Sequence, residues 1–194
     1  MENRQMTRRM FVAAGAATVA GWALWRTGAL HVVEAAGAKP LPAPHDVVIV
    51  EFSDSGQNLG KKTVQTIVKS DADWKQQLPG ESFGVTRHEG TEYAYSGKYW
   101  NLHDKGLYRC ICCDTALFSS DTKFDSHTGW PSFWQPIAKE NVREITDMSL
   151  GMQRTAVACK RCDAHLGHVF DDGPDPTGLR YCMNSVSLKF VKFA

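Results

Sequence analysis

The sequence predicts a mainly β protein of antiparallel β-sheets, with short helices near the start of its domain and a structural zinc ion. From Gly106 onward, short β-prone runs alternate with turn clusters. Two C-x-x-C pairs, beginning at Cys110 and Cys159, supply the ligands of a zinc site. Hydrophobic residues make up 43% of the chain and the formal net charge is +1, which suits a packed core and excludes the basic surface that nucleic acid requires.

Residues 1–38 are predicted to be an export leader. Arg8 and Arg9 form a twin-arginine pair, and a mostly apolar run follows from Phe11 to Trp25. This run is shorter than the roughly 20 residues of a membrane-spanning helix, and Ala36-Gly37-Ala38 provides a cleavage pattern. Two outcomes fit this pattern: a cleaved signal peptide that leaves the protein in the periplasm by the twin-arginine route, or an uncleaved membrane anchor.

The folded part is expected to begin with a hairpin. A Pro/Ala-rich linker at 39–46 precedes a domain at 47–194, whose core covers about 71–190. Two β-branched runs, Val47–Phe52 and Thr63–Val68, predict strands that pair with each other across a turn.

Two short helices are expected after the hairpin. Ser70 and Asp73 have the spacing of a capping box, so the first helix begins there, continues to about Leu78 and stops at Pro79. The second is expected at Glu81–His88, and both would cover one end of a sheet. The remaining strands are expected at Leu107–Cys110, Ala116–Phe118, Val142–Thr146, Arg154–Ala158, Ala164–Phe170, Leu179–Asn184 and Ser187–Val191.

The two C-x-x-C pairs predict one tetrahedral zinc site. Cys110 with Cys113, and Cys159 with Cys162, would each direct two thiolates at one point. Four sulfur ligands leave no open position for water, so the zinc would be structural. The alternatives are a redox-active dithiol and, in an exported protein, a pair of disulfides. Cys112 alternates with Cys113 along the chain and is expected to face away from the metal.

Cys182 lies in a predicted strand with two polar residues on the same face. Arg180 and Asn184 each stand two positions from Cys182, and side chains two apart in a strand point the same way. A guanidinium group would favour the thiolate, and an amide can donate or accept hydrogen bonds. From the residues alone, Cys182 is either a reactive thiol or an inert core cysteine.

Two further clusters could serve such a thiol. His165 and His168 follow the second cysteine pair closely, and imidazoles can raise a thiolate fraction or transfer protons. Trp130 and Phe133 belong to a dense aromatic turn, which would form either a hydrophobic cap on the sheet or a pocket for a small apolar group such as an S-methyl.

Together these segments resemble the MsrB-type methionine-R-sulfoxide reductases over about residues 71–190. The points of resemblance are Cys110 and Cys113, Lys123-Phe124-Asp125-Ser126, Gly129-Trp130-Pro131-Ser132-Phe133, Cys159 and Cys162, His165-Leu166-Gly167-His168-Val169-Phe170, and Gly178-Leu179-Arg180-Tyr181-Cys182-Met183-Asn184-Ser185. The resemblance implies a tent-like arrangement of antiparallel sheets and the reduction of methionine-R-sulfoxide to methionine.

The resemblance also implies a role for each site residue. The thiolate of Cys182 would attack the sulfoxide sulfur and end as a sulfenic acid. His165 or His168 would protonate the departing oxygen. The remaining implied roles are substrate orientation by Asn184, stabilisation of the thiolate by Arg180, and contact with the substrate methyl region by Trp130 and Phe133.

One position departs from the family pattern. Many members carry a resolving cysteine just before the Gly-Trp-Pro-Ser-Phe turn, and this chain has Thr128 there. Either an external thiol attacks the sulfenic acid, or Cys112 takes the place of the resolving cysteine. The resemblance implies a thioredoxin-like or other thiol reductant and protein substrates that contain methionine sulfoxide. We expect a monomer with zinc and no organic cofactor.

Two other functions fit parts of the pattern. A non-catalytic zinc-stabilised binding module would share the fold, but we would expect it to lack Cys182, His165 or Trp130, and all three are present. A disulfide oxidoreductase that used one C-x-x-C pair would bind less than one zinc per chain. Its thiol exchange would also survive the substitution Cys182→Ser.

Overall fold

The computed structural model describes residues 40–148 and 153–193. The predicted leader and its cleavage pattern lie outside these ranges. None of the helices within them has the length and apolarity of a membrane-spanning segment.

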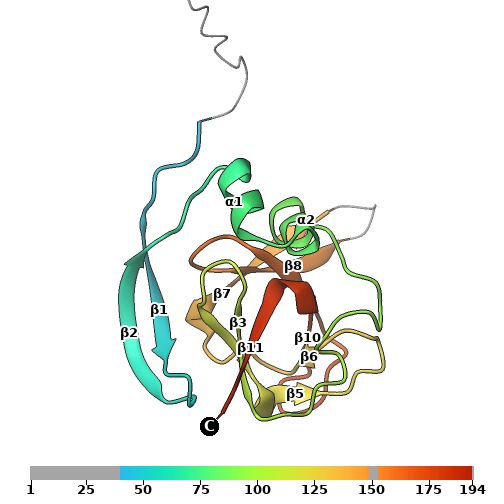
Figure 1. Cartoon of the computed structure of the whole chain (residues 1–194). Helices are drawn as coiled ribbons and strands as arrows, with labels where there is room; N and C mark the ends of the chain where they lie inside the picture. Colours follow the sequence, from blue (N-terminus) through green and yellow to red (C-terminus); the bar gives the residue numbers. More distant parts are fainter. Residues whose placement is uncertain (1–39, 149–152, 194) are drawn as a thin grey trace, which may run out of the picture. The chain divides into compact units, whose positions relative to one another are not determined.

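The described residues form three antiparallel sheets and two short helices (Figure 1). The six-stranded sheet has the order β5 (Lys123–Phe124), β6 (Ser132–Phe133), β10 (Arg180–Met183), β9 (His165–Phe170), β8 (Arg154–Cys159) and β7 (Val142–Asp147). The three-stranded sheet has the order β11 (Leu188–Lys192), β3 (Gly106–Cys110) and β4 (Ala116–Ser119). β1 (Asp46–Phe52) and β2 (Asn58–Gln65) form a separate hairpin. The predicted mainly β, antiparallel class is confirmed.

Both predicted helices are present. α1 spans Asp71–Gln77, and Ser70 and Asp73 form the expected capping box at its start. α2 spans Gly80–His88. Trp74 of α1 is fully buried, and the cationic groups of Lys69 and Arg87 lie 4.9 Å and 5.0 Å from its ring centroid. Two cation–π contacts therefore help to fix this indole.

Two features of the strands differ from the prediction. β2 begins at Asn58 and ends at Gln65, whereas Thr63–Val68 was expected. Nearly all of β2 is solvent-exposed on both faces, so its sequence lacks the alternation that would mark its start. β5 and β6 are additional strands of two residues each, too short to show a period of two.

The core lies between the six-stranded and the three-stranded sheets. Phe118 of β4 stacks on Phe133 of β6 with ring centroids 4.5 Å apart, and Tyr108 of β3 meets Phe133 edge-on at 4.9 Å. All three rings are fully buried. Burial of an aromatic side chain of this size contributes about 1.5–3 kcal/mol. Short 3-10 turns connect strands around this core, at η1 (Ser120–Thr122), η2 (Lys139–Asn141) and η4 (Ser185–Ser187).

Candidate active site and metal centre

Four cysteine sulfurs come together at one end of the sheets. The Sγ atoms of Cys110, Cys113, Cys159 and Cys162 all lie within 4.8 Å of one another. The Cys110–Cys162 and Cys113–Cys159 sulfur pairs are 3.6 Å and 3.5 Å apart, far longer than a disulfide bond. All four cysteines are free, as a zinc site needs and as the disulfide alternative does not allow. The cluster therefore matches a structural zinc centre of four thiolates.

The two cysteine turns have the same backbone geometry. Asp114 and Asp163 donate their amides to the carbonyls of Cys110 and Cys159, at 2.9 Å and 3.0 Å. Both aspartates adopt left-handed backbone conformations, with φ of 62° and 54°. Each turn therefore curls its two sulfurs toward the same point, and we call these two turns the zinc knuckles.

The N-terminal elements hold the zinc knuckles through backbone carbonyls. The amide of Ile67 donates to the carbonyl of Arg161 at 2.8 Å. The Gln77 side chain of α1 donates to the Cys112 carbonyl, and Arg87 of α2 donates to the Cys162 carbonyl, both at 2.8 Å. The two helices were expected to cover one end of a sheet, and these contacts show that they also brace the metal site. Cys112 is buried and is not one of the four clustered sulfurs.

Cys182 occupies the middle of the six-stranded sheet, apart from this cluster. On β10 its neighbours across the sheet are His168 of β9 and Ser132 of β6. Arg180 and Cys182 are half-buried, whereas Tyr181 between them is buried, so Arg180 and Cys182 share one face as predicted. Directly opposite residues of antiparallel strands have Cβ atoms about 4.5–5.5 Å apart, so the side chains of Cys182 and His168 start from neighbouring positions on one face of the sheet.

Hydroxyl groups surround the Cys182 sulfur. The hydroxyl of Thr128 lies 3.9 Å from Sγ. Ser126 joins this group through contacts of 2.8 Å to the Thr128 hydroxyl and 2.7 Å to the Ser132 hydroxyl. Thr128 therefore lies where a residue can touch the thiol, which is the position at which the family pattern has a resolving cysteine.

Burial raises the pKa of the Cys182 thiol above its usual value. The Thr128 hydroxyl and the positive charge of Arg180 act in the opposite direction, but burial outweighs them. Arg180 itself is held by Asp172 through two hydrogen bonds of 2.8 Å and lies 4.3 Å over the Phe170 ring. The guanidinium thus favours the thiolate, as predicted, while the resting group at neutral pH is the thiol.

The two histidines have different environments. His168 contacts Asp147 at 2.9 Å, and Arg154 contacts the same carboxylate at 2.8 Å. His165 is buried, and among the described residues its Nε2 has no hydrogen-bond partner. Burial, with a smaller contribution from His168, lowers the pKa of His165 to about 4. His165 is therefore neutral at neutral pH, whereas His168 is paired with the Asp147 carboxylate.

A cavity of about 640 Å³ lies between α2 and the strands β7, β8 and β9. His165, His168 and Asp147 contribute to its wall, and exposed Ile145 and Met148 lie at its margin. Cys182 is not part of the wall, but its cross-strand neighbour His168 is. His168 is therefore the residue that links the cavity wall to the strand of Cys182.

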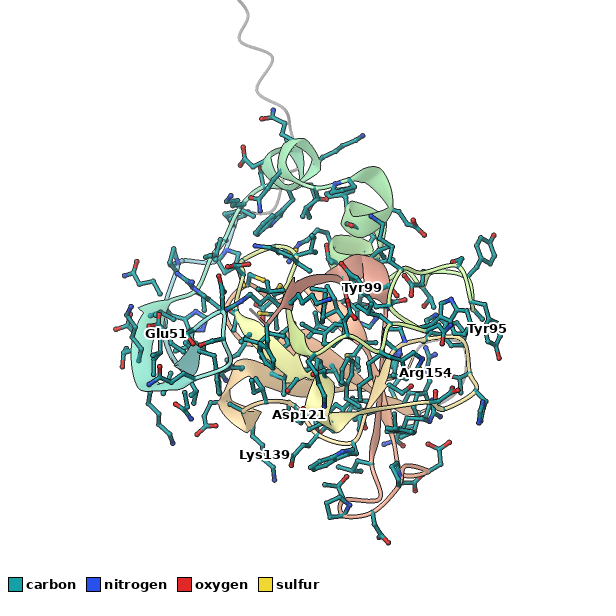
Figure 2. The ribbon with its side chains drawn as sticks, turned by 60° about the horizontal axis from the view of Figure 1, so that its bottom comes forward. Glu51, Tyr95, Tyr99, Asp121, Lys139 and Arg154 are labelled. Carbon is teal, nitrogen blue, oxygen red and sulfur yellow. The ribbon has the colours of Figure 1, made fainter. Side chains whose placement is uncertain are left out.

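Trp130, on the loop before β6, is half-buried, and its indole N–H donates to the Glu92 carbonyl at 3.2 Å. The neighbouring Tyr95 donates to the His127 carbonyl at 2.7 Å and supports this loop. Figure 2 shows Tyr95 and Arg154 on one side of the molecule, with Glu51 of β1 on the opposite side. The candidate site and the β1–β2 hairpin therefore lie on opposite sides of the domain.

Two of the residues predicted to contact the substrate are buried. Phe133 has no exposed surface and stacks in the core, because Ser132 takes the face toward Cys182 and its neighbour must point the other way. Asn184 is also buried. Its Oδ1 accepts from the Glu92 amide at 3.0 Å and its Nδ2 donates to the Leu166 carbonyl at 3.0 Å. Both ends of its amide thus bind the backbone, and these bonds hold the chain around the site.

The structure also adds residues that the sequence reasoning did not identify. Ser126 and Ser132 lie in the segments that resemble the family, but nothing in the sequence indicates that their hydroxyls lie near Cys182. Asp147 and Glu92 reach the site from distant parts of the chain. Charged residues of this kind are common on surfaces, so only the fold reveals their partners.

The fold and the site define a zinc-stabilised β protein in which Cys182 stands apart from the metal, beside a histidine–aspartate pair and a group of hydroxyls. Residues 78–192 match the family model described as the SelR domain, and this range contains all four zinc cysteines and Cys182. The chain belongs to the SelR-domain family of MsrB-type methionine sulfoxide reductases.

Similar proteins carry the corresponding name. "Peptide methionine sulfoxide reductase MsrB" of Herminiimonas arsenicoxydans is 55% identical over 126 residues, which cover 65% of this chain and 92% of that protein. The protein of the same name from Synechococcus sp. (strain RCC307) is 58% identical over 121 residues, 62% of this chain and 89% of that protein. "Peptide methionine sulfoxide reductase B1, chloroplastic" of Oryza sativa subsp. japonica is 55% identical over 134 residues, 69% of this chain and 62% of that protein.

Proposed function

We propose that this peptide methionine sulfoxide reductase reduces the R epimer of methionine sulfoxide, with Cys182 as the nucleophile. The observation that carries the proposal is the place of Cys182 within the family match. It lies on β10 directly opposite His168, separate from the four sulfurs that suit zinc. Protein-bound methionine sulfoxide is the proposed substrate.

The reaction transfers one oxygen atom between two sulfurs. Cys182 gives up its proton as the substrate binds, and the thiolate attacks the sulfoxide sulfur. The substrate S–O bond breaks and the oxygen ends on Cys182 as a sulfenic acid. The substrate sulfur gains two electrons and leaves as methionine, while the Cys182 sulfur loses two. Sulfur is required because the nucleophile must accept oxygen.

The surrounding residues have distinct proposed roles. His168, paired with Asp147, holds the proton that the departing oxygen receives. His165 is buried and neutral, and we assign it to the wall of the substrate cavity. Arg180 lowers the cost of the thiolate, and the indole of Trp130 contacts the substrate methyl group.

An external thiol regenerates the enzyme. Thr128 cannot form a disulfide with Cys182, although its hydroxyl lies within 3.9 Å of the sulfur. Cys112 is buried, its carbonyl is bound by α1, and no contact joins it to Cys182 among the described residues. A thioredoxin-like or other thiol donor therefore attacks the sulfenic acid and releases water. A second thiol then completes the reduction.

The cellular location, domain organisation and oligomeric state of the enzyme are proposed from its sequence. The twin-arginine pair supports export to the periplasm, with residues 1–38 either removed or kept as an anchor, 39–46 as a linker and 47–194 as the reductase domain. The monomer is the proposed working form. The donor in that compartment would be a periplasmic or membrane-linked thiol relay.

The test is a comparison of epimers with the zinc-loaded full chain. Separate R and S epimers of a blocked methionine sulfoxide are incubated with the enzyme and dithiothreitol, and methionine is quantified. Consumption of the R epimer alone, and only when Cys182 is present, is the expected result. A folded, zinc-loaded protein that consumes neither epimer would instead support a non-catalytic zinc-stabilised binding module.

A further inference from the structure

Glu92 is a buried carboxylate in the loop between α2 and β3. Only 3% of its surface is exposed, and no cation forms an ion pair with it among the described residues. Burial raises the pKa of its carboxyl group. A charged or polar group buried in this way costs free energy unless its hydrogen bonds are satisfied, so its partners indicate why it is there.

All four polar positions of Glu92 are bound to residues near the active site. The carboxylate accepts the amides of Ser185 at 2.7 Å and Val186 at 3.0 Å. The Glu92 amide donates to Asn184 at 3.0 Å, and its carbonyl accepts the indole N–H of Trp130 at 3.2 Å. Glu92 thus joins the turn that follows Cys182 to the side chain proposed to contact the substrate methyl group.

The loop that carries Glu92 fits tightly against the same turn. A Cβ atom added at Gly97 would lie 2.5 Å from the Glu92 carboxylate and would also collide with Ser185. The amide of Tyr99 donates to the Ser185 hydroxyl at 3.2 Å. The close packing and this hydrogen bond tie the loop to the turn.

We infer that Glu92 is a positioning residue of the methionine sulfoxide site: its side chain fixes the turn after Cys182, and its carbonyl fixes the Trp130 indole at a set distance from that turn. This inference rests on the proposed function. The substrate would bridge these two points, with its sulfur at Cys182 and its methyl group at the indole. Because the substrate would contact both points, a change in their spacing would weaken its binding.

The first experiment measures kcat and KM for a peptide that contains methionine-R-sulfoxide, using the zinc-loaded full chain. In Glu92→Gln, one of the two backbone amides loses its acceptor, because the NH2 group of glutamine cannot accept. We expect kcat/KM to fall about tenfold, mainly through KM. Glu51→Gln, in the β1–β2 hairpin on the opposite side of the domain, is the matched control and should behave as the wild type. A Glu92→Gln enzyme with wild-type kcat and KM would overturn the inference.

The second experiment tests whether Glu92 acts through Trp130. Trp130→Phe keeps an aromatic ring but removes the N–H that Glu92 binds. If the two residues form one unit, the double variant should be at most about twofold worse than the more impaired single variant. Losses that multiply in full would show that Glu92 does not act through the indole and would contradict the inference.

Folding is checked separately from positioning. Near-ultraviolet circular dichroism and zinc content are measured on each variant before the kinetics. If Glu92→Gln does not fold, Glu92→Asp keeps the charge but is too short to reach both amides, and it should show the same rise in KM. Failure of both variants to fold would assign Glu92 to domain stability and overturn the inference. An inactive wild-type enzyme would instead refute the proposed function itself.

Discussion

The zinc knuckles and the Cys182 strand use the same side chain in opposite surroundings. In the zinc knuckles, four sulfurs converge within 4.8 Å, and N-terminal elements bind the carbonyls of Arg161, Cys112 and Cys162. On β10, one sulfur lies among hydroxyls, beside an imidazole and near a guanidinium. The partners, and not the residue type, decide whether a cysteine holds a metal or reacts.

Replacing the reactive cysteine should have the largest effect on activity. Cys182→Ser should lower methionine sulfoxide reduction about a thousandfold or more, because a hydroxyl cannot accept the oxygen atom. Zinc content and circular dichroism should match the wild type. Loss of zinc in this variant would mean that the two cysteine regions are not independent.

The converse change is made in a zinc knuckle. Cys159→Ser should release zinc and lower the free energy of unfolding by about 5 kcal/mol or more, enough to unfold a domain of ordinary stability. Metal analysis and denaturant titration measure both effects. A stable, metal-free Cys159→Ser protein would argue that packing alone holds the two turns together.

The buried imidazole of His165 should make the stability of the domain depend on pH. The pKa of His165 is about 4 in the folded protein, against an ordinary value of 6.5, so below pH 6.5 the unfolded chain binds more protons. Stability should therefore fall as the pH drops from 6.5 to 4, by about 2–3 kcal/mol from this group. Acid also weakens zinc binding, so wild type and His165→Asn are compared by urea titration at each pH. The same loss in both proteins would contradict the expectation.

The smallest expected effect on rate comes from Thr128. Thr128→Cys should keep the dithiothreitol-supported rate within about threefold, because the residue touches Cys182 without taking part in oxygen transfer. One turnover without reductant should then join the introduced thiol to Cys182 in a disulfide, seen in the intact mass as the loss of two hydrogens. Thr128→Ser is the control and should keep the added oxygen of the sulfenic acid. Absence of the disulfide would place residue 128 out of reach of the sulfur.

Much of the fold could be predicted from local pattern. β-branched runs predicted the longer strands, capping residues predicted α1, and the C-x-x-C spacing predicted the four clustered sulfurs. β5 and β6 were not predicted, because two residues are too few to show the alternation of a strand. The start of β2 was not predicted, because both faces of this strand are exposed and its sequence does not alternate between apolar and polar residues.

The site was less predictable because burial is decided by distant parts of the chain. Phe133 was expected to contact substrate, but the register between β6 and β10 turns Ser132 toward the site and Phe133 into the core. Asn184 was expected to meet substrate, but Glu92 and Leu166 occupy its amide. No local signal marks Glu92, since its role depends on contacts made across the fold.

The limits of the family match are not the limits of the folding unit. The match begins at residue 78, yet the fully buried side chain of Asn141 makes two of its three hydrogen bonds to Val50 in β1 and the third to Ala116. A fragment that began at residue 78 would keep every catalytic candidate. It would leave the buried Asn141 amide without two of its hydrogen-bond partners, which costs about 1–3 kcal/mol of stability. It would also lose the hydrogen bond from the Ile67 amide to the Arg161 carbonyl, so the hairpin and the segment after it belong in any version of this enzyme made for the laboratory.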